Sequence, residues 1–120
     1  MERQKTLLLT GASRGIGHAT VRKFNSEGWR VITCSRHPFP EKCPWGGGRE
    51  DHVQVDLADP KSVIAAVEDI RGRIDGKLDA LVNNAGIAIF KPLLETSFDE
   101  WRRVLATNLD GVFLCSQACA

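Results

Sequence analysis

Apolar and polar residues follow two periods along this chain, one typical of buried strands and one typical of helices. Short apolar runs bounded by polar turns predict four strands. They fall at residues 6–10, 31–34, 52–57 and 79–84. Between and after them, apolar residues recur every three to four positions, which predicts helices that begin near Gly15, Pro60 and Ser97. Residues 37–50 are rich in proline and glycine, so we expect an exposed, irregular loop there.

Capping signals mark the starts of two predicted helices. Asp59 can cap the second helix, with Pro60 at the first position, where the missing N–H group has no consequence. Ser97 and Glu100 have the spacing of a capping box at the start of the last helix. The apolar face expected on the second helix consists of Val63, Ile64, Val67, Ile70 and Ile74.

Strands that alternate with helices and are buried on both faces indicate a parallel sheet covered by helices on both sides. Right-handed crossovers then give a doubly wound, Rossmann-like α/β fold with the strand order 3-2-1-4. A chain of 120 residues is long enough for one hydrophobic core and too short for two ordinary domains. The sequence therefore predicts that residues 1–120 belong to one domain.

Glycines and polar side chains stand at the points where the predicted strands end. Residues 10–17 read Thr-Gly-Ala-Ser-Arg-Gly-Ile-Gly, and a glycine-rich turn that leads into a helix forms an anion site. Arg36 follows the second strand, Asp56 ends the third, and Asn83 and Asn84 end the fourth. Ligands of parallel sheets bind at the carboxyl ends of the strands, so these positions predict a dinucleotide crevice. The alternative is that each of them only forms a turn.

The residue after the second strand bears on the choice of dinucleotide. An acidic residue there would bind the ribose 2′-hydroxyl group of NAD, but this chain has Arg36, about twenty residues after the glycine turn. A guanidinium group suits a 2′-phosphate, which favours NADP over NAD. Arg14, inside the glycine turn, could supply a second positive charge. In the alternative interpretation both arginines are solvated surface residues.

The last predicted helix carries an amide within its apolar stripe, which consists of Trp101, Val104, Leu105, Val112, Cys115 and Cys119. Asn108 is four residues from both Val104 and Val112, so we expect it to face inward with them. A buried amide needs hydrogen-bond partners. Asn108 is therefore either satisfied within the structure or placed to hold a water molecule or a substrate.

Composition and charge exclude several classes of partner. The formal net charge is +1 and no apolar run approaches the length of a bilayer span, so we expect neither a nucleic acid nor a membrane partner. No signal-peptide pattern follows Met1, which predicts a cytoplasmic protein. The four cysteines show no Cys-x-x-Cys spacing and the histidines have no ligand partners at useful spacing, so we expect reduced thiols and no metal site.

These motifs together resemble those of the short-chain dehydrogenase/reductase family, and the resemblance covers nearly the whole chain. Residues 10–17 are similar to its Thr-Gly-x-x-x-Gly-x-Gly signature, residues 83–86 to its Asn-Asn-Ala-Gly motif, and residues 108–111 to its Asn-x-x-Gly pattern. The resemblance implies the N-terminal, cofactor-binding portion of a Rossmann domain in an NADP(H)-dependent oxidoreductase. Such an enzyme transfers hydride between nicotinamide and a carbonyl or alcohol substrate, and homo-oligomers, dimers or tetramers, are common in the family.

The resemblance also implies a role for each matching residue. The residues that would cradle the phosphates are Gly11, Ser13, Arg14, Gly15, Ile16 and Gly17. Those that would contact the adenine are Asp56 and Leu57, and those beside the nicotinamide ribose are Asn84, Ala85 and Gly86. Asn108 would be a member of the catalytic tetrad that holds a water molecule in a proton relay.

The chain departs from the family pattern because it contains no tyrosine. In the family, the catalytic serine and a Tyr-x-x-x-Lys segment follow a fifth strand, so the resemblance implies a chain truncated before that strand. The alternative function is a non-catalytic dinucleotide-binding or redox-sensing protein that lacks the Tyr/Lys pair. A nucleotide-sugar epimerase or dehydratase on a similar fold fits less well, because its first turn tends to read Gly-x-x-Gly-x-x-Gly.

A polypeptide limited to residues 1–120 is expected to fold poorly or to aggregate. Its fourth strand would present an open apolar edge, and its last helix would have an uncovered apolar face. Size-exclusion chromatography and thermal melting followed by circular dichroism test this expectation. A monomer that melts in one sharp cooperative transition would contradict it.

Overall fold

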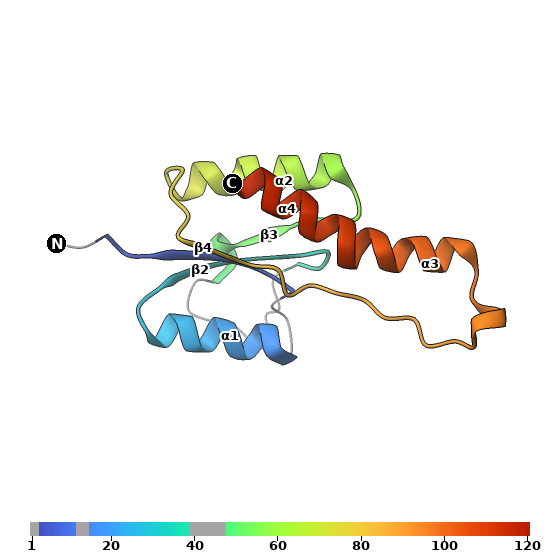
Figure 1. Ribbon diagram of the computed structural model, residues 1–120. Helices are drawn as coiled ribbons and strands as arrows, with labels where there is room; N and C mark the ends of the chain where they lie inside the picture. The colour runs from blue at the N-terminus through green and yellow to red at the C-terminus, as the bar shows by residue number, and fades with distance from the viewer. Residues whose placement is uncertain (1–2, 12–14, 39–47) are drawn as a thin grey trace.

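Four parallel strands form one sheet in the order β3-β2-β1-β4 in the computed structural model, which describes residues 3–11, 15–38 and 48–120. The strands are β1 (Thr6–Thr10), β2 (Arg30–Ser35), β3 (His52–Gln54) and β4 (Ala80–Val82). Each pair of neighbours is parallel. The predicted strand order and the Rossmann-like α/β fold class are thus confirmed (Figure 1).

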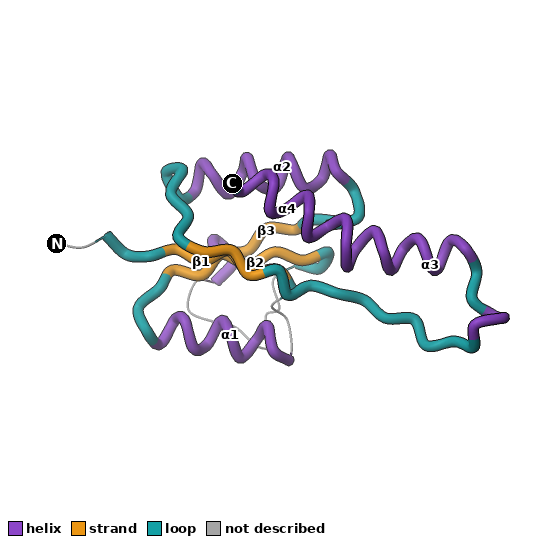
Figure 2. The backbone as a smooth tube through the Cα atoms, viewed as in Figure 1, coloured by secondary structure: helices purple, strands orange, loops and turns teal. Residues whose placement is uncertain are grey.

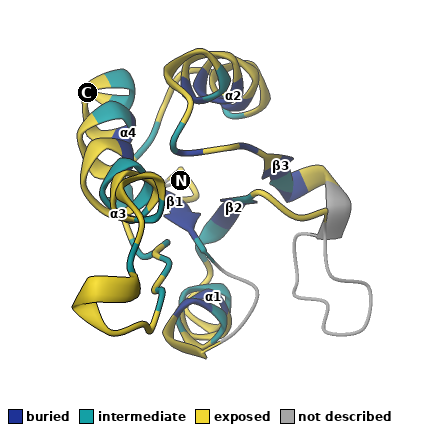
Figure 3. Ribbon diagram, turned by 90° about the vertical axis from the view of Figure 1, so that its right-hand side faces the viewer, coloured by how far each residue is buried: buried dark blue, intermediate teal, exposed yellow. Residues whose placement is uncertain are grey.

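Helices cover both faces of the sheet. Helix α1 (Gly15–Ser26) lies on one face, and α2 (Pro60–Arg73) and α4 (Gly111–Cys119) lie on the other (Figure 3). Helix α3 (Phe98–Leu105) extends beyond the end of the sheet, and a long loop with one short 3₁₀ helix leads to it from β4 (Figure 2). Within the described ranges, no helix is both long enough and apolar enough to cross a bilayer.

The side chains of β1 divide the core between the two faces of the sheet, because successive residues of a strand point in opposite directions. Leu7 and Leu9 pack with Val21 of α1. Leu8 faces the opposite side, where it joins a larger cluster that contains Ile32 and residues of α2 and α4. Burial on both faces explains why the central strands are continuous apolar runs in the sequence.

Both predicted helix caps are confirmed. The side chain of Asp59 accepts the N–H of Lys61 at 3.1 Å, and Pro60 is the first residue of α2. At the start of α3, the Ser97 hydroxyl accepts the N–H of Glu100, and the Glu100 carboxylate accepts the N–H of Ser97. These reciprocal bonds satisfy donors that the first turn of a helix otherwise leaves unpaired.

The strands β3 and β4 are shorter than predicted because side chains replace the backbone ladder at their ends. β3 ends at Gln54 and not at residue 57, since the N–H of Asp56 donates to the hydroxyl of Ser62 at 2.9 Å. β4 ends at Val82 and not at residue 84, since the following amide groups bind the hydroxyl of Thr10.

The last predicted helix is interrupted, and part of its apolar stripe is exposed. A π-helical segment, Ala106–Asp110, separates α3 from α4. Trp101 is 56% exposed and Val112 is 37% exposed, so the predicted inward-facing stripe is wrong for these residues. Trp101 is exposed because α3 lies beyond the sheet (Figure 1) and has no buried residue.

One residue of the predicted apolar face of α2 also points elsewhere. Ile64 is 58% exposed. The residues of α2 that are buried are Val63, Ala66, Val67 and Ile70. This set has the i, i+3, i+4, i+7 spacing of a single helical face, which leaves Ile64 at its margin.

The expected irregular loop over residues 37–50 ends in a short 3₁₀ helix, Gly48–Asp51, so that expectation is wrong at this end. The carboxylate of Asp51 accepts a hydrogen bond from the Arg30 guanidinium at 2.9 Å, which ties this turn to the start of β2. Residues 39–47 lie outside the described part of the chain.

Gly17 should not tolerate a larger side chain, because a Cβ atom there would collide with the carbonyl oxygen of Gly11. We expect Gly17→Ala to lower the free energy of unfolding by about 1–3 kcal/mol through overpacking. The control is Gly72→Ala, where the Cβ atom would meet open space on α2. That change should raise stability by up to about 1 kcal/mol through helix propensity. Urea denaturation measures both values, and equal effects of the two substitutions would contradict the close contact.

Candidate functional site

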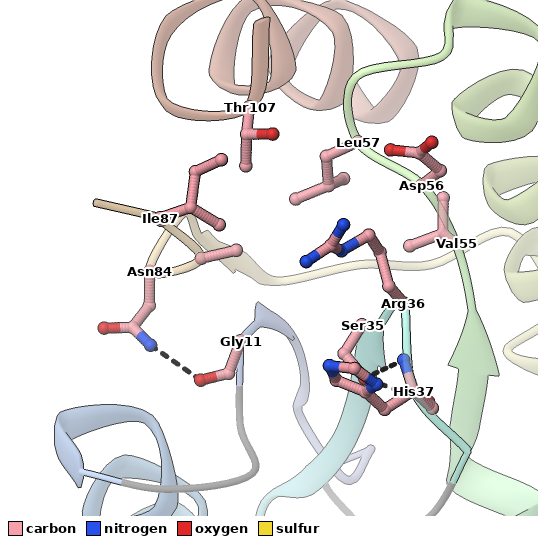
Figure 4. A pocket seen from close by; sticks show the side chains of 12 residues that line it. Gly11, Ser35, Arg36, His37, Val55, Asp56, Leu57, Asn84, Ile87 and Thr107 are labelled. Carbon is pink, nitrogen blue, oxygen red and sulfur yellow. Dashed lines mark hydrogen bonds between the residues drawn. The ribbon is translucent and has the colours of Figure 1, made fainter. Parts of the chain in front are cut away.

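A cavity of about 250 Å³ opens where the carboxyl ends of the four strands meet (Figure 4). Its lining residues follow β1, β2, β3 and β4, with one contribution from the π-helical segment. They are Gly11, Ser35, Arg36, His37, Val55, Asp56, Leu57, Asn84, Ala85, Gly86, Ile87 and Thr107. The structure thereby brings together the predicted site residues Gly11, Arg36, Asp56, Leu57, Asn84, Ala85 and Gly86.

Among the described residues of the predicted site, Gly15, Ile16, Gly17 and Asn108 do not line this cavity. Gly15, Ile16 and Gly17 form the first turn of α1. Ser13 and Arg14 fall outside the described residues. Asn108 lies in the π-helical segment, next to Thr107, which does line the cavity.

The glycine turn after β1 packs directly against the segment after β4. Gly11 has a φ of 73°, and a Cβ atom there would lie only 2.7 Å from the Cα atom of Ala85. The side-chain amide of Asn84 donates to the carbonyl oxygen of Gly11 at 2.8 Å (Figure 4). Both the positive φ and the lack of space therefore require glycine at position 11.

The side chain of Thr10 joins the same two segments, although it was not among the predicted site residues. Its hydroxyl oxygen accepts the N–H groups of Asn84 and Ala85 at 3.0 and 2.9 Å. Thr10 is only 1% exposed. The signal in the sequence is a hydroxyl residue at the end of an otherwise apolar strand, a position where a buried polar group needs partners.

Arg36 extends from the end of β2 and points its guanidinium group into the cavity (Figure 4). Asp56 lies across from it, but its carboxylate points away and accepts the N–H of Ala58 at 3.0 Å. In the described part of the chain, Arg36 forms no ion pair. The lining therefore includes a guanidinium group that no described carboxylate pairs with.

Asn108 binds the backbone of the loop after β4 with both ends of its side-chain amide. The side-chain oxygen accepts the N–H of Ile87 at 2.8 Å, and the side-chain nitrogen donates to the carbonyl oxygen of Ile87 at 2.8 Å. These bonds correspond to the first alternative for Asn108, in which the amide is satisfied within the structure. The expectation of a buried position is wrong, because Asn108 is exposed within the widened π turn.

An ion pair ties the loop between β4 and α3 to the start of α3. The ammonium group of Lys91 lies 2.7 Å from the carboxylate of Glu100. The bond from Lys91, together with the N–H of Ser97, lowers the pKa of Glu100 to about 2. The carboxylate therefore stays ionised near neutral pH and fixes the geometry of this connection.

Comparison with known proteins gives the same reading of the motifs. A family model described as short chain dehydrogenase matches residues 5–120. The chain belongs to the short chain dehydrogenase family. Its relatives include FixR from Bradyrhizobium diazoefficiens, 48% identical over 121 residues, with 94% of this chain and 44% of that protein covered. Another is the 3-oxoacyl-[acyl-carrier-protein] reductase FabG of Salmonella typhimurium, 36% identical over 116 residues, with coverage of 95% and 47%.

Solved structures of short chain dehydrogenases share the fold of this chain. An oxidoreductase from Brucella ovis in complex with a partially ordered NAD is 48% identical, with a TM-score of 0.89 and coverage of 98% of this chain and 56% of that one. A metagenomic short-chain oxidoreductase in complex with NADP is 33% identical, with a TM-score of 0.82 and coverage of 95% and 54%. The chain thus spans about half the length of the relatives it matches.

The described thiols of this short chain dehydrogenase chain are Cys34, Cys115 and Cys119. Cys34 and Cys115 are buried free cysteines, and Cys119 is half-buried. Burial raises the pKa of Cys34, and it raises that of Cys115 to about 11, so both thiols stay protonated at neutral pH. Among the residues that the structure describes, no three or more His, Cys, Asp or Glu side chains gather in a way that could hold a metal ion.

Asn108→Ala should loosen the loop after β4 because it removes both bonds to Ile87. We expect hydrogen exchange at the Ile87 amide to accelerate by up to about tenfold, the factor that corresponds to the net free energy of such bonds. NMR-detected exchange measures this. Asn83→Ala is the matched control, since Asn83 binds the hydroxyl of Ser116 and not Ile87. Unchanged exchange at Ile87 in Asn108→Ala would contradict the clamp.

Proposed function

We propose that residues 1–120 form the cofactor-binding portion of a single Rossmann domain in an NADP(H)-dependent oxidoreductase. The bound nicotinamide supplies or accepts the hydride, and the other reactant is a small carbonyl compound or alcohol. Membership of the short chain dehydrogenase family supports this proposal. So do similar proteins whose descriptions specify NAD, NADP or NADPH.

The observation that carries the proposal is the cavity itself. Its wall combines the start of a tight glycine turn, an arginine that no described carboxylate pairs with, and the end of β4, all at the carboxyl edge of a parallel sheet. That edge is where doubly wound sheets bind nucleotides. Its volume of about 250 Å³ lies just below the roughly 300–1,000 Å³ of typical ligand pockets, so we assign part of the dinucleotide to it and the remainder to the surface beside it.

The first turn of α1 and the glycine turn before it hold the phosphates. The first N–H groups of a helix have no partners within the helix, and the helix dipole favours an anion there. A Cβ atom at Gly17 would collide with the carbonyl oxygen of Gly11, so the start of α1 packs directly against the beginning of the glycine turn. The residues assigned to this role are Gly11, Gly15, Ile16 and Gly17, together with Ser13 and Arg14, which lie outside the described residues.

Arg36 binds the 2′-phosphate of NADP. Two features support this assignment. The guanidinium group points into the cavity without an ion pair from the described residues (Figure 4), and no carboxylate ends β2 to accept a ribose hydroxyl. A guanidinium–phosphate contact is charge-assisted and often bidentate, which makes it a strong basis for selecting the phosphorylated cofactor.

The remaining assignments follow the lining of the cavity. Asp56 and Leu57 contact the adenine, and the segment Asn84, Ala85 and Gly86 contacts the ribose beside the nicotinamide. Asn108 serves catalysis by holding a water molecule in a proton relay. Its exposure supports this role. The two bonds to Ile87 use one N–H and one oxygen lone pair of the side-chain amide, so a second N–H and a second lone pair remain for a water molecule.

The protein works as a cytoplasmic homo-oligomer, a dimer or a tetramer, with a small molecule as substrate. Apolar side chains on and after α3 support an interface between copies, because clustered exposed apolar residues mark protein contacts. The residues more than half exposed there are Phe98, Trp101, Leu109 and Phe113. A formal net charge of +1 supplies no field that would attract nucleic acid or a membrane.

Arg36→Asp tests the choice of cofactor, because it replaces attraction of the 2′-phosphate by repulsion. In the purified full-length protein, we expect the Kd for NADPH to rise on the order of a hundredfold and the Kd for NADH to change much less. Fluorescence titration measures both constants. Arg22→Asp is the control, since Arg22 is an exposed residue of α1 outside the cavity lining. Equal losses for both cofactors would refute the role of Arg36, and no binding of either dinucleotide by the unmodified protein would refute the function.

A further inference from the structure

Three consecutive carbonyl groups at the end of β2 are each bound by a group from β3 or from the residue that follows β3. The carbonyl oxygen of Ser35 accepts the N–H of Val55 at 2.7 Å. The carbonyl oxygen of Arg36 accepts the side-chain amide of Gln54 at 2.8 Å. The next carbonyl oxygen, that of His37, lies 2.9 Å from the Nε2 atom of His52.

The parallel register explains how two side chains of β3 reach this segment. His52 pairs with Thr33, and Gln54 pairs with Ser35 at the last position of the ladder. Residues two apart on a strand lie on the same face, so His52 and Gln54 share a face while Val53 between them is buried in the core. The side chains thus continue the ladder where the backbone of the two strands separates.

His52 is anchored to β2 as well as to this segment. A carbonyl oxygen can only accept, so the Nε2 atom of His52 carries the proton that is donated to His37. The Nδ1 atom lies 2.7 Å from the hydroxyl of Thr33, a fully buried residue of β2. The hydroxyl of Ser35 adds a local turn, since it donates to the carbonyl of His37 at 3.0 Å.

These bonds hold the backbone of Arg36 in place, because they bind its own carbonyl group and the carbonyl groups of both neighbouring residues. The guanidinium group has no ion pair within the described residues, so the backbone decides where the side chain starts and in which direction it extends. A cation whose anchor is already ordered loses less conformational freedom when it binds an anion. A disordered anchor would weaken contacts to Arg36 and leave contacts made elsewhere in the cavity unchanged.

We propose that Gln54, supported by His52, is a positioning residue that sets the preference for a ribose with a 2′-phosphate over one with a 2′-hydroxyl. It acts through the backbone of Arg36 and touches no part of the cofactor. The inference rests on the proposed function, in which Arg36 binds the 2′-phosphate. It adds that the selectivity of this arginine depends on the neighbouring edge strand β3.

Gln54→Met tests the proposal, because methionine keeps the length of the side chain and removes the donor. In the full-length protein, we expect the Kd for NADPH to rise about threefold to tenfold, the range of one neutral hydrogen bond, and the Kd for NADH to change less than about twofold. Gln54→Leu also lacks the donor, so it too should raise the Kd for NADPH more than the Kd for NADH. Fluorescence titration measures the constants, and circular dichroism checks that each variant is folded.

Gln4→Met is the matched control. The side-chain amide of Gln4 also donates to a backbone carbonyl, that of Gly28, at 3.1 Å, and Gln4 is exposed like Gln54. It lies before β1, at the end of the sheet opposite the cavity. We expect its substitution to change neither Kd, so any loss of NADPH binding in Gln54→Met is specific to the site.

A double-mutant cycle with Arg36→Ala separates positioning from a general structural effect. If Gln54 acts through Arg36, Gln54→Met should have no further effect on NADPH binding once Arg36 is alanine. An equal weakening of NADPH and NADH by Gln54→Met, or an effect that persists in Arg36→Ala, would overturn the inference alone. If Arg36→Ala weakens the binding of NADPH and NADH equally, the proposed role of Arg36 fails and the inference fails with it.

Discussion

A single buried hydroxyl group holds the two central parts of this site together. The side chain of Thr10 accepts the N–H groups of both Asn84 and Ala85, and so joins the end of β1 to the end of β4. Without it, two partly buried backbone donors would lose their partner. The glycine turn follows directly and packs against Ala85 with no space for a side chain. This junction therefore fixes the ends of β1 and β4 relative to each other at the cavity.

The two sides of the cavity are built in different ways. The side of the glycine turn consists of backbone atoms and a helix terminus, which any dinucleotide with a pyrophosphate could approach. The side after β2 depends on one long side chain, Arg36, and on the bonds that β3 makes to its backbone. In the proposed function, shared recognition comes from the backbone, and the distinction between related cofactors comes from side chains. This division explains how one fold serves relatives described with NAD and with NADP.

Much of this architecture could be predicted from residue patterns, because local rules decide it. The apolar runs, the caps at Asp59 and Ser97 and the glycine turn each specify structure over a few residues. The errors arose where distant contacts decide. The ends of β3 and β4 depend on hydroxyl groups of Ser62 and Thr10, which no local pattern reveals. The exposure of Trp101 depends on how far α3 extends beyond the sheet, which periodicity alone cannot show.

The π-helical segment has a consequence for the direction of α3. A π turn holds about one more residue than an α turn, and one residue corresponds to about 100° of rotation around the helix axis. The apolar side chains of α3 are therefore out of phase with Cys115, which keeps α4 against the sheet. Gain or loss of a single residue between 106 and 110 would rotate the side chains of α3 about the helix axis and leave the core unaltered. In a lineage, this one turn can reorient an exterior surface independently of the interior.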